Sequence, residues 1–209
     1  MDIVEAMHWR YACKKFDPAR SLSPDLLDAL IEVFHLTATS YGLQPLQMVV
    51  VDNKELQEQL LPHSFNQRQV VDCSHVLVLC VNTDVDSGFV KEYFEMVHDQ
   101  RGTDEEILRP FSNQLQNKFD KQEEDVTLEW AMRQCYIALG KLMVACAALR
   151  IDSCPMEGFL PDEYNRLLGL DQQNLHATLV LPVGYRAADD AFASFEKVRR
   201  PIDEIVHRR

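Results

Sequence analysis

Residues 128–159, LEWAMRQCYIALGKLMVACAALRIDSCPMEGF, decide the fold of this chain. Within 135–149 almost every residue is apolar or small, and only Lys141 carries a charge. A helix that is apolar nearly all round is enclosed by other elements, so this segment predicts a buried central helix, in the core or at a subunit interface. A membrane span is the alternative, but Arg133, Gln134 and Lys141 interrupt the run of about 20 apolar residues that a bilayer requires.

The end of this stretch indicates a turn. Arg150 and Asp152 close the helix, and residues 154–158 contain Pro155 and Gly158. Proline restricts the residue before it and glycine tolerates unusual φ values, so we expect a short extended segment that ends in a tight turn. Such a turn is well placed to present backbone N–H groups to a ligand.

Composition bounds the class of protein. The 209 residues are 46% hydrophobic, which is ample for one globular domain. The net charge of −12 argues against nucleic acid and membrane surfaces as partners, since both attract an excess of Lys and Arg. No apolar run of signal-peptide length is visible near the start, so we expect a cytoplasmic protein. Six cysteines without a C-x-x-C pair predict buried reduced thiols and no metal site.

Apolar strands embedded among helices predict an α+β or α/β fold in three layers. Strands are expected at 46–51, 76–81 and 177–183, and helices at 2–9, from Ser23 to about Thr37, after Asn53 and at 161–168. Residues 83–127 are rich in charges and amides and predict two or three peripheral helices. The tail at 195–209 carries Ile202, Ile205 and Val206, so we expect it to dock on the fold or on a partner subunit.

Two polar segments are candidates for ligand contact. In residues 10–16, RYACKKF, alternation places Arg10, Ala12 and Lys14 on one side of an extended strip, although a solvated basic strip would have the same pattern. The loop at 40–45, SYGLQP, lies between a helix and a buried strand, where loops often contact ligands. Its alternative role is a connecting turn whose hydroxyl groups cap the helix.

No motif supplies acid–base or nucleotide chemistry. The sequence has no G-x-G-x-x-G after a strand, no P-loop, no H-E-x-x-H and no G-x-S-x-G, and its seven histidines are scattered. Proteins without such residues often rely on the chemistry of a cofactor.

Several separated motifs together resemble the nitroreductase family of FMN-dependent oxidoreductases. The motifs are spread over about 190 residues, and only the segment 83–127 lies outside the resemblance. It rests on R-x-A-x-K-x-F at 10–16, SYGLQP at 40–45, Asn66, the central helix with PMEGF at 155–159, PVGY at 182–185 and KVR-x-P at 197–201.

The resemblance implies a single FMN-binding domain over residues 1–209, with a variable helical excursion at about 83–127 that covers the flavin. The implied fold is α+β, a three-layer α-β-α sandwich, in an intertwined homodimer with a long buried central helix. It also implies one FMN in each of two sites at the interface.

Site residues follow from the resemblance position by position. Arg10, Lys197 and Arg199 would hold the FMN phosphate, which suits the fork of Arg and the point charge of Lys. Lys14 would lie near the pyrimidine end of the flavin, and the backbone N–H of Glu157 would reach N5; these two residues are the catalytic candidates. Further cofactor-binding candidates are Tyr11, Ala12, Asn66, Gln69, Pro155, Met156 and Gly158, with Ser40, Tyr41 and Gln44 approaching from the partner subunit.

Three positions depart from the family pattern. Ala12 stands where many members have a serine, Gln69 where some have a basic residue, and Leu46 where many have Trp. These differences leave open whether NADH or NADPH is preferred.

The implied activity is hydride transfer from NAD(P)H through flavin N5 to a small electron-poor acceptor such as a nitroaromatic or a quinone. The alternatives are a flavin or pteridine reductase of the same family, a non-catalytic flavin-binding module, and a structural dimer with an empty cleft.

Overall fold

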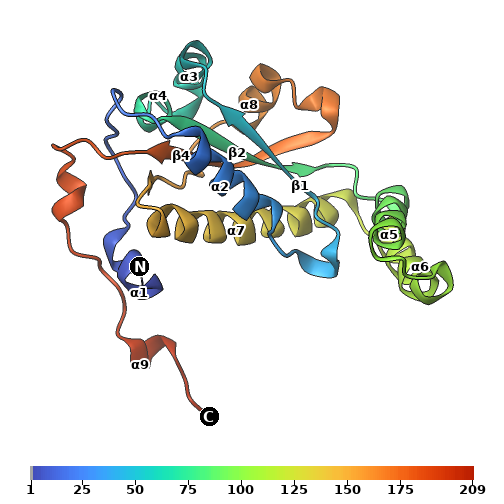
Figure 1. Cartoon of the computed structure of the whole chain (residues 1–209). Coiled ribbons are helices and arrows are strands. Elements are labelled where there is room, and N and C mark those ends of the chain that lie inside the picture. Colours follow the sequence, from blue (N-terminus) through green and yellow to red (C-terminus); the bar gives the residue numbers. More distant parts are fainter. Residues whose placement is uncertain (1) are drawn as a thin grey trace.

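The computed structural model describes residues 2–209. Most elements begin and end at local signals: Pro24 opens α2, the Asn53 side chain caps α3, and Gly169 closes α8 in the left-handed conformation. In chain order the helices and strands are α1 (Ile3–Trp9), α2 (Pro24–His35), β1 (Leu46–Val51), α3 (Lys54–Leu60), α4 (Gln69–Asp72), β2 (His75–Asn82), α5 (Ser87–Arg101), α6 (Glu105–Lys121), α7 (Glu124–Ala148), β3 (Asp152–Ser153), α8 (Pro161–Leu168), β4 (Leu175–Gly184) and α9 (Ile202–Ile205) (Figure 1).

The sheet is antiparallel throughout, with the order β1-β2-β4-β3. The three predicted strands are confirmed as β1, β2 and β4. The fourth strand, β3, was not predicted; it pairs Asp152 with Gly184 and Ser153 with Val183. It begins the segment that leads to Pro155, so the turn is attached to the edge of the sheet.

Alternating side chains of β2 and β4 build two cores on opposite faces of the sheet. Val76, Val78 and Cys80 face the core that includes residues of α3, α4 and α8, whereas Leu77 and Leu79 face the core beneath α2 and α7. Figure 1 shows these helices as layers above and below the sheet. The predicted three-layer α+β arrangement is therefore confirmed.

The central helix α7 differs from its prediction in two ways. It begins at Glu124, so residues 124–127 belong to it and not to the peripheral excursion. It is also not enclosed within this chain, because Tyr136 is 47% exposed and Ile137 45% exposed, while Ala131 and Cys135 on its other side are fully buried. Burial all round is therefore not reached within the single chain, and burial of this side at a subunit interface stays a prediction.

The peripheral excursion consists of α5 and α6, which project together from one end of the molecule (Figure 1). They share a small core of Val90, Phe94, Leu115 and Phe119, which reaches the rest of the fold through Leu43. None of the helices within residues 2–209 is long and apolar enough to cross a membrane.

The C-terminal tail runs past α1 and away from the sheet (Figure 1). Val198 is 89% exposed and Ile202 75% exposed. The apolar residues of the tail therefore do not pack on their own fold, which was one of the two expected outcomes. Docking on a partner subunit stays a prediction.

Candidate functional site

The N-terminal strip, residues 10–16, lies beside the edge of the sheet. Ala12 forms a parallel bridge with Ser153 of β3, and Phe16 forms an antiparallel bridge with Arg186. The backbone N–H of Cys13 donates to the Ser153 carbonyl at 3.1 Å. The start of the chain is thereby held against the segment that carries the Pro155 turn and against the chain that follows β4.

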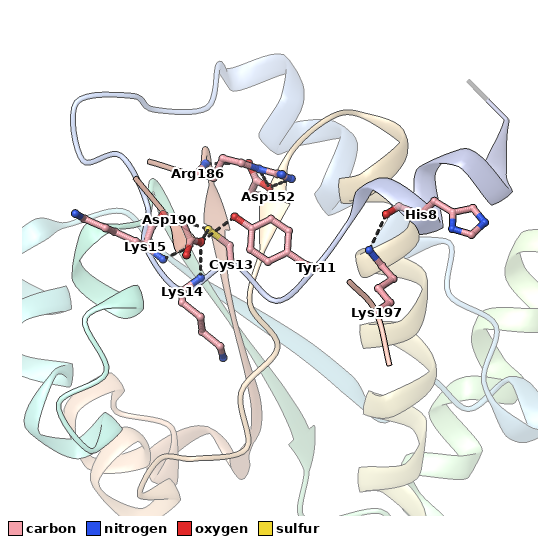
Figure 2. A network of polar contacts seen from close by, with 9 residues as sticks. All are labelled: His8, Tyr11, Cys13, Lys14, Lys15, Asp152, Arg186, Asp190 and Lys197. Atoms are coloured by element: carbon pink, nitrogen blue, oxygen red, sulfur yellow. Dashed lines mark hydrogen bonds and ion pairs between the residues drawn. The ribbon is translucent and has the colours of Figure 1, made fainter. Parts of the chain in front are cut away.

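Asp190 holds the strip from the opposite end of the sequence (Figure 2). Its Oδ2 accepts hydrogen bonds from the Tyr11 hydroxyl at 2.8 Å, the Lys14 N–H at 3.0 Å and the Lys15 N–H at 3.3 Å. Burial alone would raise the pKa of Asp190, but these bonds and one from the Phe192 N–H lower it below its ordinary value. Burial and the bond to Asp190 raise the pKa of Tyr11.

A second buried carboxylate, Asp152, fixes Arg186. The Arg186 Nε and its backbone N–H each donate to Asp152 at 2.8 Å. The guanidinium lies 4.4 Å from the centre of the Trp9 ring and 4.5 Å from that of Tyr11. Burial would lower the pKa of Arg186, but Asp152 raises it above its ordinary value, so this arginine is a permanent structural cation.

Three further cations from both ends of the chain gather beside the strip. Burial, followed by the charge of Arg199, lowers the pKa of Arg10, and burial together with Arg10 and Arg199 lowers the pKa of Lys197. Lys197 Nζ donates to the His8 carbonyl at 2.6 Å (Figure 2). Within residues 2–209 none of the three pairs with a carboxylate, and the buried Arg10 Nε has no hydrogen-bond partner. Mutually repelling cations with a free donor form a site suited to an anion.

Lys14 extends from the strip toward the Pro155 segment. Its Nζ lies 3.6 Å from the Sγ of Cys154, a fully buried thiol. Burial raises the pKa of Cys154, although Lys14 opposes this shift, so the thiol is a neutral contact for the ammonium group. The Lys14 amine therefore lies at one end of the segment that contains Glu157.

The Pro155 segment is partly a continuation of the sheet. Cys154 and Met156 donate backbone hydrogen bonds to Pro182 and Val180 of β4, so the turn begins only after Met156. Gly158 does not adopt the positive φ that we expected of it. A Cβ there would lie 3.1 Å from Gln67 Nε2, so a side chain at this position would displace the Gln67 amide slightly.

The backbone N–H of Glu157 is free to bind a ligand, whereas its side chain is already hydrogen-bonded. Its backbone N–H has no acceptor within the described residues 2–209. Its carboxylate accepts a hydrogen bond from Tyr136 of α7 at 2.6 Å, which raises the pKa of that phenol. The turn is therefore tied to the central helix by the side chain while its N–H stays free.

Asn66 lies close to this turn. Gln67 Nε2 donates to the Gly158 carbonyl at 2.8 Å, which joins the two loops. Phe65 and Asn66 both have positive φ, 51° and 56°, so the backbone folds sharply here and leaves Asn66 exposed. Gln69 is the first residue of α4 and only 8% exposed.

The loop residues Ser40, Tyr41 and Gln44 are not brought to this site within one chain. The Ser40 N–H donates to Gln134 of α7 at 3.0 Å. Residues two apart in a helix point to opposite sides, so this loop lies across α7 from Tyr136 and Glu157. Tyr41 stacks on Trp130 and accepts a hydrogen bond from Lys118, and Gln44, like Tyr41, has a positive φ.

Five residues that organise the site were missed by sequence reasoning. They are Tyr136, Asp152, Cys154, Arg186 and Asp190. An aromatic residue on the apolar central helix was a usable signal for Tyr136. Asp190 gave none, because nothing in its neighbourhood indicates that it meets residues 11–15.

The chain is similar to known proteins over nearly its whole length. A Staphylococcus epidermidis protein provisionally named an NAD(P)H nitroreductase is 34% identical over 219 residues, covering 98% of this chain and 95% of that protein. An oxygen-insensitive NAD(P)H nitroreductase from Salmonella typhimurium is 28% identical over 97% of each chain. A nitroreductase-like structure from Exiguobacterium sibiricum, solved in complex with FMN, superposes with a TM-score of 0.84 at 21% identity, covering 100% of this chain and 98% of that one. The model of the Nitroreductase family matches residues 7–185, and the chain belongs to that family.

Proposed function

We propose that the protein is an FMN-dependent NAD(P)H oxidoreductase. The observation that carries this proposal is the meeting of Arg10, Lys197 and Arg199 from both ends of an acidic chain, without a carboxylate partner within residues 2–209. A phosphate monoester fits this cluster, because it takes up charge-assisted bonds that the protein leaves unmade, including one from the orphan Arg10 Nε.

The rest of the site fits a flavin ring. Lys14 would place its side chain near the pyrimidine end, Asn66 would hydrogen-bond the polar edge, and the free N–H of Glu157 would serve N5. Tyr11, Ala12, Gln69, Pro155, Met156 and Gly158 complete the binding surface. When bound, FMN supplies the redox chemistry, taking up a hydride from NAD(P)H and releasing it to an electron-poor acceptor such as a nitroaromatic or a quinone.

The protein residues contribute orientation and electrostatics. With FMN bound, Lys14 would stabilise negative charge on the flavin away from N5, and the Glu157 N–H would give a fixed polar contact at N5. The bond from Tyr136 to Glu157 restrains that turn. The neutral Cys154 leaves the Lys14 charge uncompensated.

Two copies of the chain complete each site. The exposed side of α7, with Ile137 and Val144, continues onto Val33 and Leu36 of α2 as a largely apolar groove. Permanent homodimers bury surfaces of this kind. The loop with Ser40, Tyr41 and Gln44 lies on the far side of α7 from Glu157 and serves the site of the partner. The exposed tail with Ile202 and Ile205 packs on the same partner.

Reconstitution tests the proposal. Flavin-free protein is mixed with FMN or riboflavin, and NADH and NADPH oxidation is followed with a nitroaromatic or a quinone present. FMN should restore multiple turnovers and bind more tightly than riboflavin. Tight FMN binding without turnover would instead indicate a non-catalytic flavin module, and absence of FMN binding would refute the proposal.

A further inference from the structure

Within residues 2–209, Asp190 is the one carboxylate that binds both the backbone and a side chain of the N-terminal strip. It is 6% exposed, and its Oδ2 takes hydrogen bonds from the Tyr11 hydroxyl and from the N–H groups of Lys14 and Lys15 (Figure 2). The Cys13 thiol also lies 3.6 Å from Oδ2, and Oδ1 accepts from the Phe192 N–H at 3.2 Å.

These contacts fix the direction in which Lys14 leaves the main chain. Two successive N–H groups that point to one oxygen restrict the backbone on both sides of the Lys14 Cα. The Lys14 side chain then extends away from Asp190 (Figure 2). Its Nζ lies 3.6 Å from the Sγ of Cys154. Asp190 does not touch the Lys14 ammonium group and so does not neutralise it.

The same carboxylate also joins the two halves of the cationic cluster. Arg10 is the first residue of the strip that Asp190 binds, and Lys197 and Arg199 follow Asp190 in the segment that returns to His8. A shift at Asp190 therefore moves both the Lys14 charge and the cations at the end of the chain.

We propose that Asp190 is a positioning residue that sets flavin affinity and reduction potential through Lys14. This inference rests on the proposed FMN function and deepens it. Asp190 contacts the strip from behind, so its effect on the flavin is exerted entirely through the residues that it aligns.

Adjacent Asp189 provides a matched control. It is exposed and pairs with the side chain of Lys15, not with the strip backbone. Asp190→Asn and Asp189→Asn remove the same charge one residue apart, but in Asp190→Asn an amide N–H₂ group can replace the oxygen that the Lys14 and Lys15 N–H groups require. We expect Asp190→Asn to weaken FMN binding about tenfold or more, and Asp189→Asn to leave it within about twofold.

The midpoint potential separates positioning from general loss of structure. FMN affinity and the midpoint potential of the bound flavin are each measured by titration of folded protein. Four proteins are compared: wild type, Asp190→Asn, Lys14→Met and the double variant. Asp190→Asn should lower the potential, with a tenfold loss of preference for reduced flavin equal to about 30 mV for two electrons. In the Lys14→Met background the same change should produce little further shift.

Each outcome decides the proposal. An Asp190→Asn chain that keeps the wild-type potential, or shifts it equally with and without Lys14, overturns the positioning role while the FMN function stands. Wild-type protein that binds no FMN overturns both. If Asp190→Asn does not fold, Asp190→Glu keeps the charge but displaces it, and is expected to show the same Lys14-dependent loss to a smaller extent.

Discussion

Asp189 and Asp190 show how environment decides what a residue does. The two are adjacent in sequence, yet one is exposed beside the Lys15 side chain and the other is buried against the N-terminal strip. Hydrogen bonds lower the pKa of Asp190 despite its burial. Its charge therefore supports the folded chain, and that support depends on pH.

The lowered pKa of Asp190 determines how its contribution to folding stability changes with pH. The unfolded carboxyl titrates near pH 4 and the folded one below it, so the folded state binds the proton more weakly. The contribution of Asp190 should be complete above about pH 5 and be lost as pH falls through both values. Urea unfolding of flavin-free wild type and Asp190→Asn should show a stability difference that is constant from about pH 5 to 7 and shrinks toward pH 3. A difference that grows on acidification would contradict the assignment.

The phosphate role of Arg199 can be isolated with a pair of flavins. Arg199→Ala removes one charged contact, so FMN binding should weaken roughly tenfold or more, whereas riboflavin, which lacks the phosphate, should bind almost as before. Arg200→Ala, the neighbouring exposed arginine, is the matched control and should change neither affinity. Equal losses for the two ligands in Arg199→Ala would refute the assignment, and fluorescence titration measures both.

At Glu157 the main chain and the side chain make separable contributions. Glu157→Gln keeps the N–H and an oxygen that can accept the Tyr136 hydroxyl, so the rate of flavin reduction should stay close to that of wild type. Glu157→Pro deletes the N–H and should slow reduction sharply or loosen the flavin. A proline variant that folds, binds FMN and is reduced at the parent rate in anaerobic stopped-flow would sink this proposal.

Among the elements, those with strong local signals were predictable from sequence. The apolar runs at 46–51 and 177–183 lie within β1 and β4, and the helix at 161–168 ends at Gly169 as expected. β3 could not be predicted, because two polar residues carry no strand pattern and pair only because β4 presents an open edge. The start of α7 was misplaced because residues 124–127 share the charged composition of the excursion before them.

Residues of the candidate site were found where the family resemblance reached them, and missed where folding alone unites them. The resemblance assigned Arg10, Lys197 and Arg199 to one anion site, and in the structure their charges influence one another. Asp190 could not be found in this way, since its partners are mainly backbone N–H groups, which every residue has. The positive φ at Tyr41 and Gln44 was equally invisible, because neither residue type favours it.

The exposed side of α7 leads to a prediction about assembly. Ile137 lies in the apolar groove between α2 and α7, so Ile137→Glu would bury a charge in the proposed interface and should shift the protein toward monomer. Met96→Glu on α5 is a control of similar exposure outside this groove. Light scattering at micromolar concentration measures the mass of each variant, and an Ile137→Glu chain that stays dimeric would contradict the interface.

At the scale of the whole molecule, the net charge of −12 affects how the cationic site retains an anionic cofactor. An acidic surface repels an anionic cofactor, so retention of FMN depends on the local cluster and not on long-range attraction. Because the rest of the chain is acidic, the three cations Arg10, Lys197 and Arg199 form a distinct site for an anion.

The central claim is that the protein passes a hydride from NAD(P)H to an acceptor through bound FMN. Sequential-mixing stopped-flow under anaerobic conditions tests it most directly: FMN-loaded protein is mixed with NADH or NADPH, and then with a nitroaromatic or a quinone. We predict that the yellow absorbance bleaches in the first mix and returns in the second, with a repeatable cycle. Flavin that stays oxidised with both nucleotides, or bleached flavin that no such acceptor reoxidises, would contradict the account.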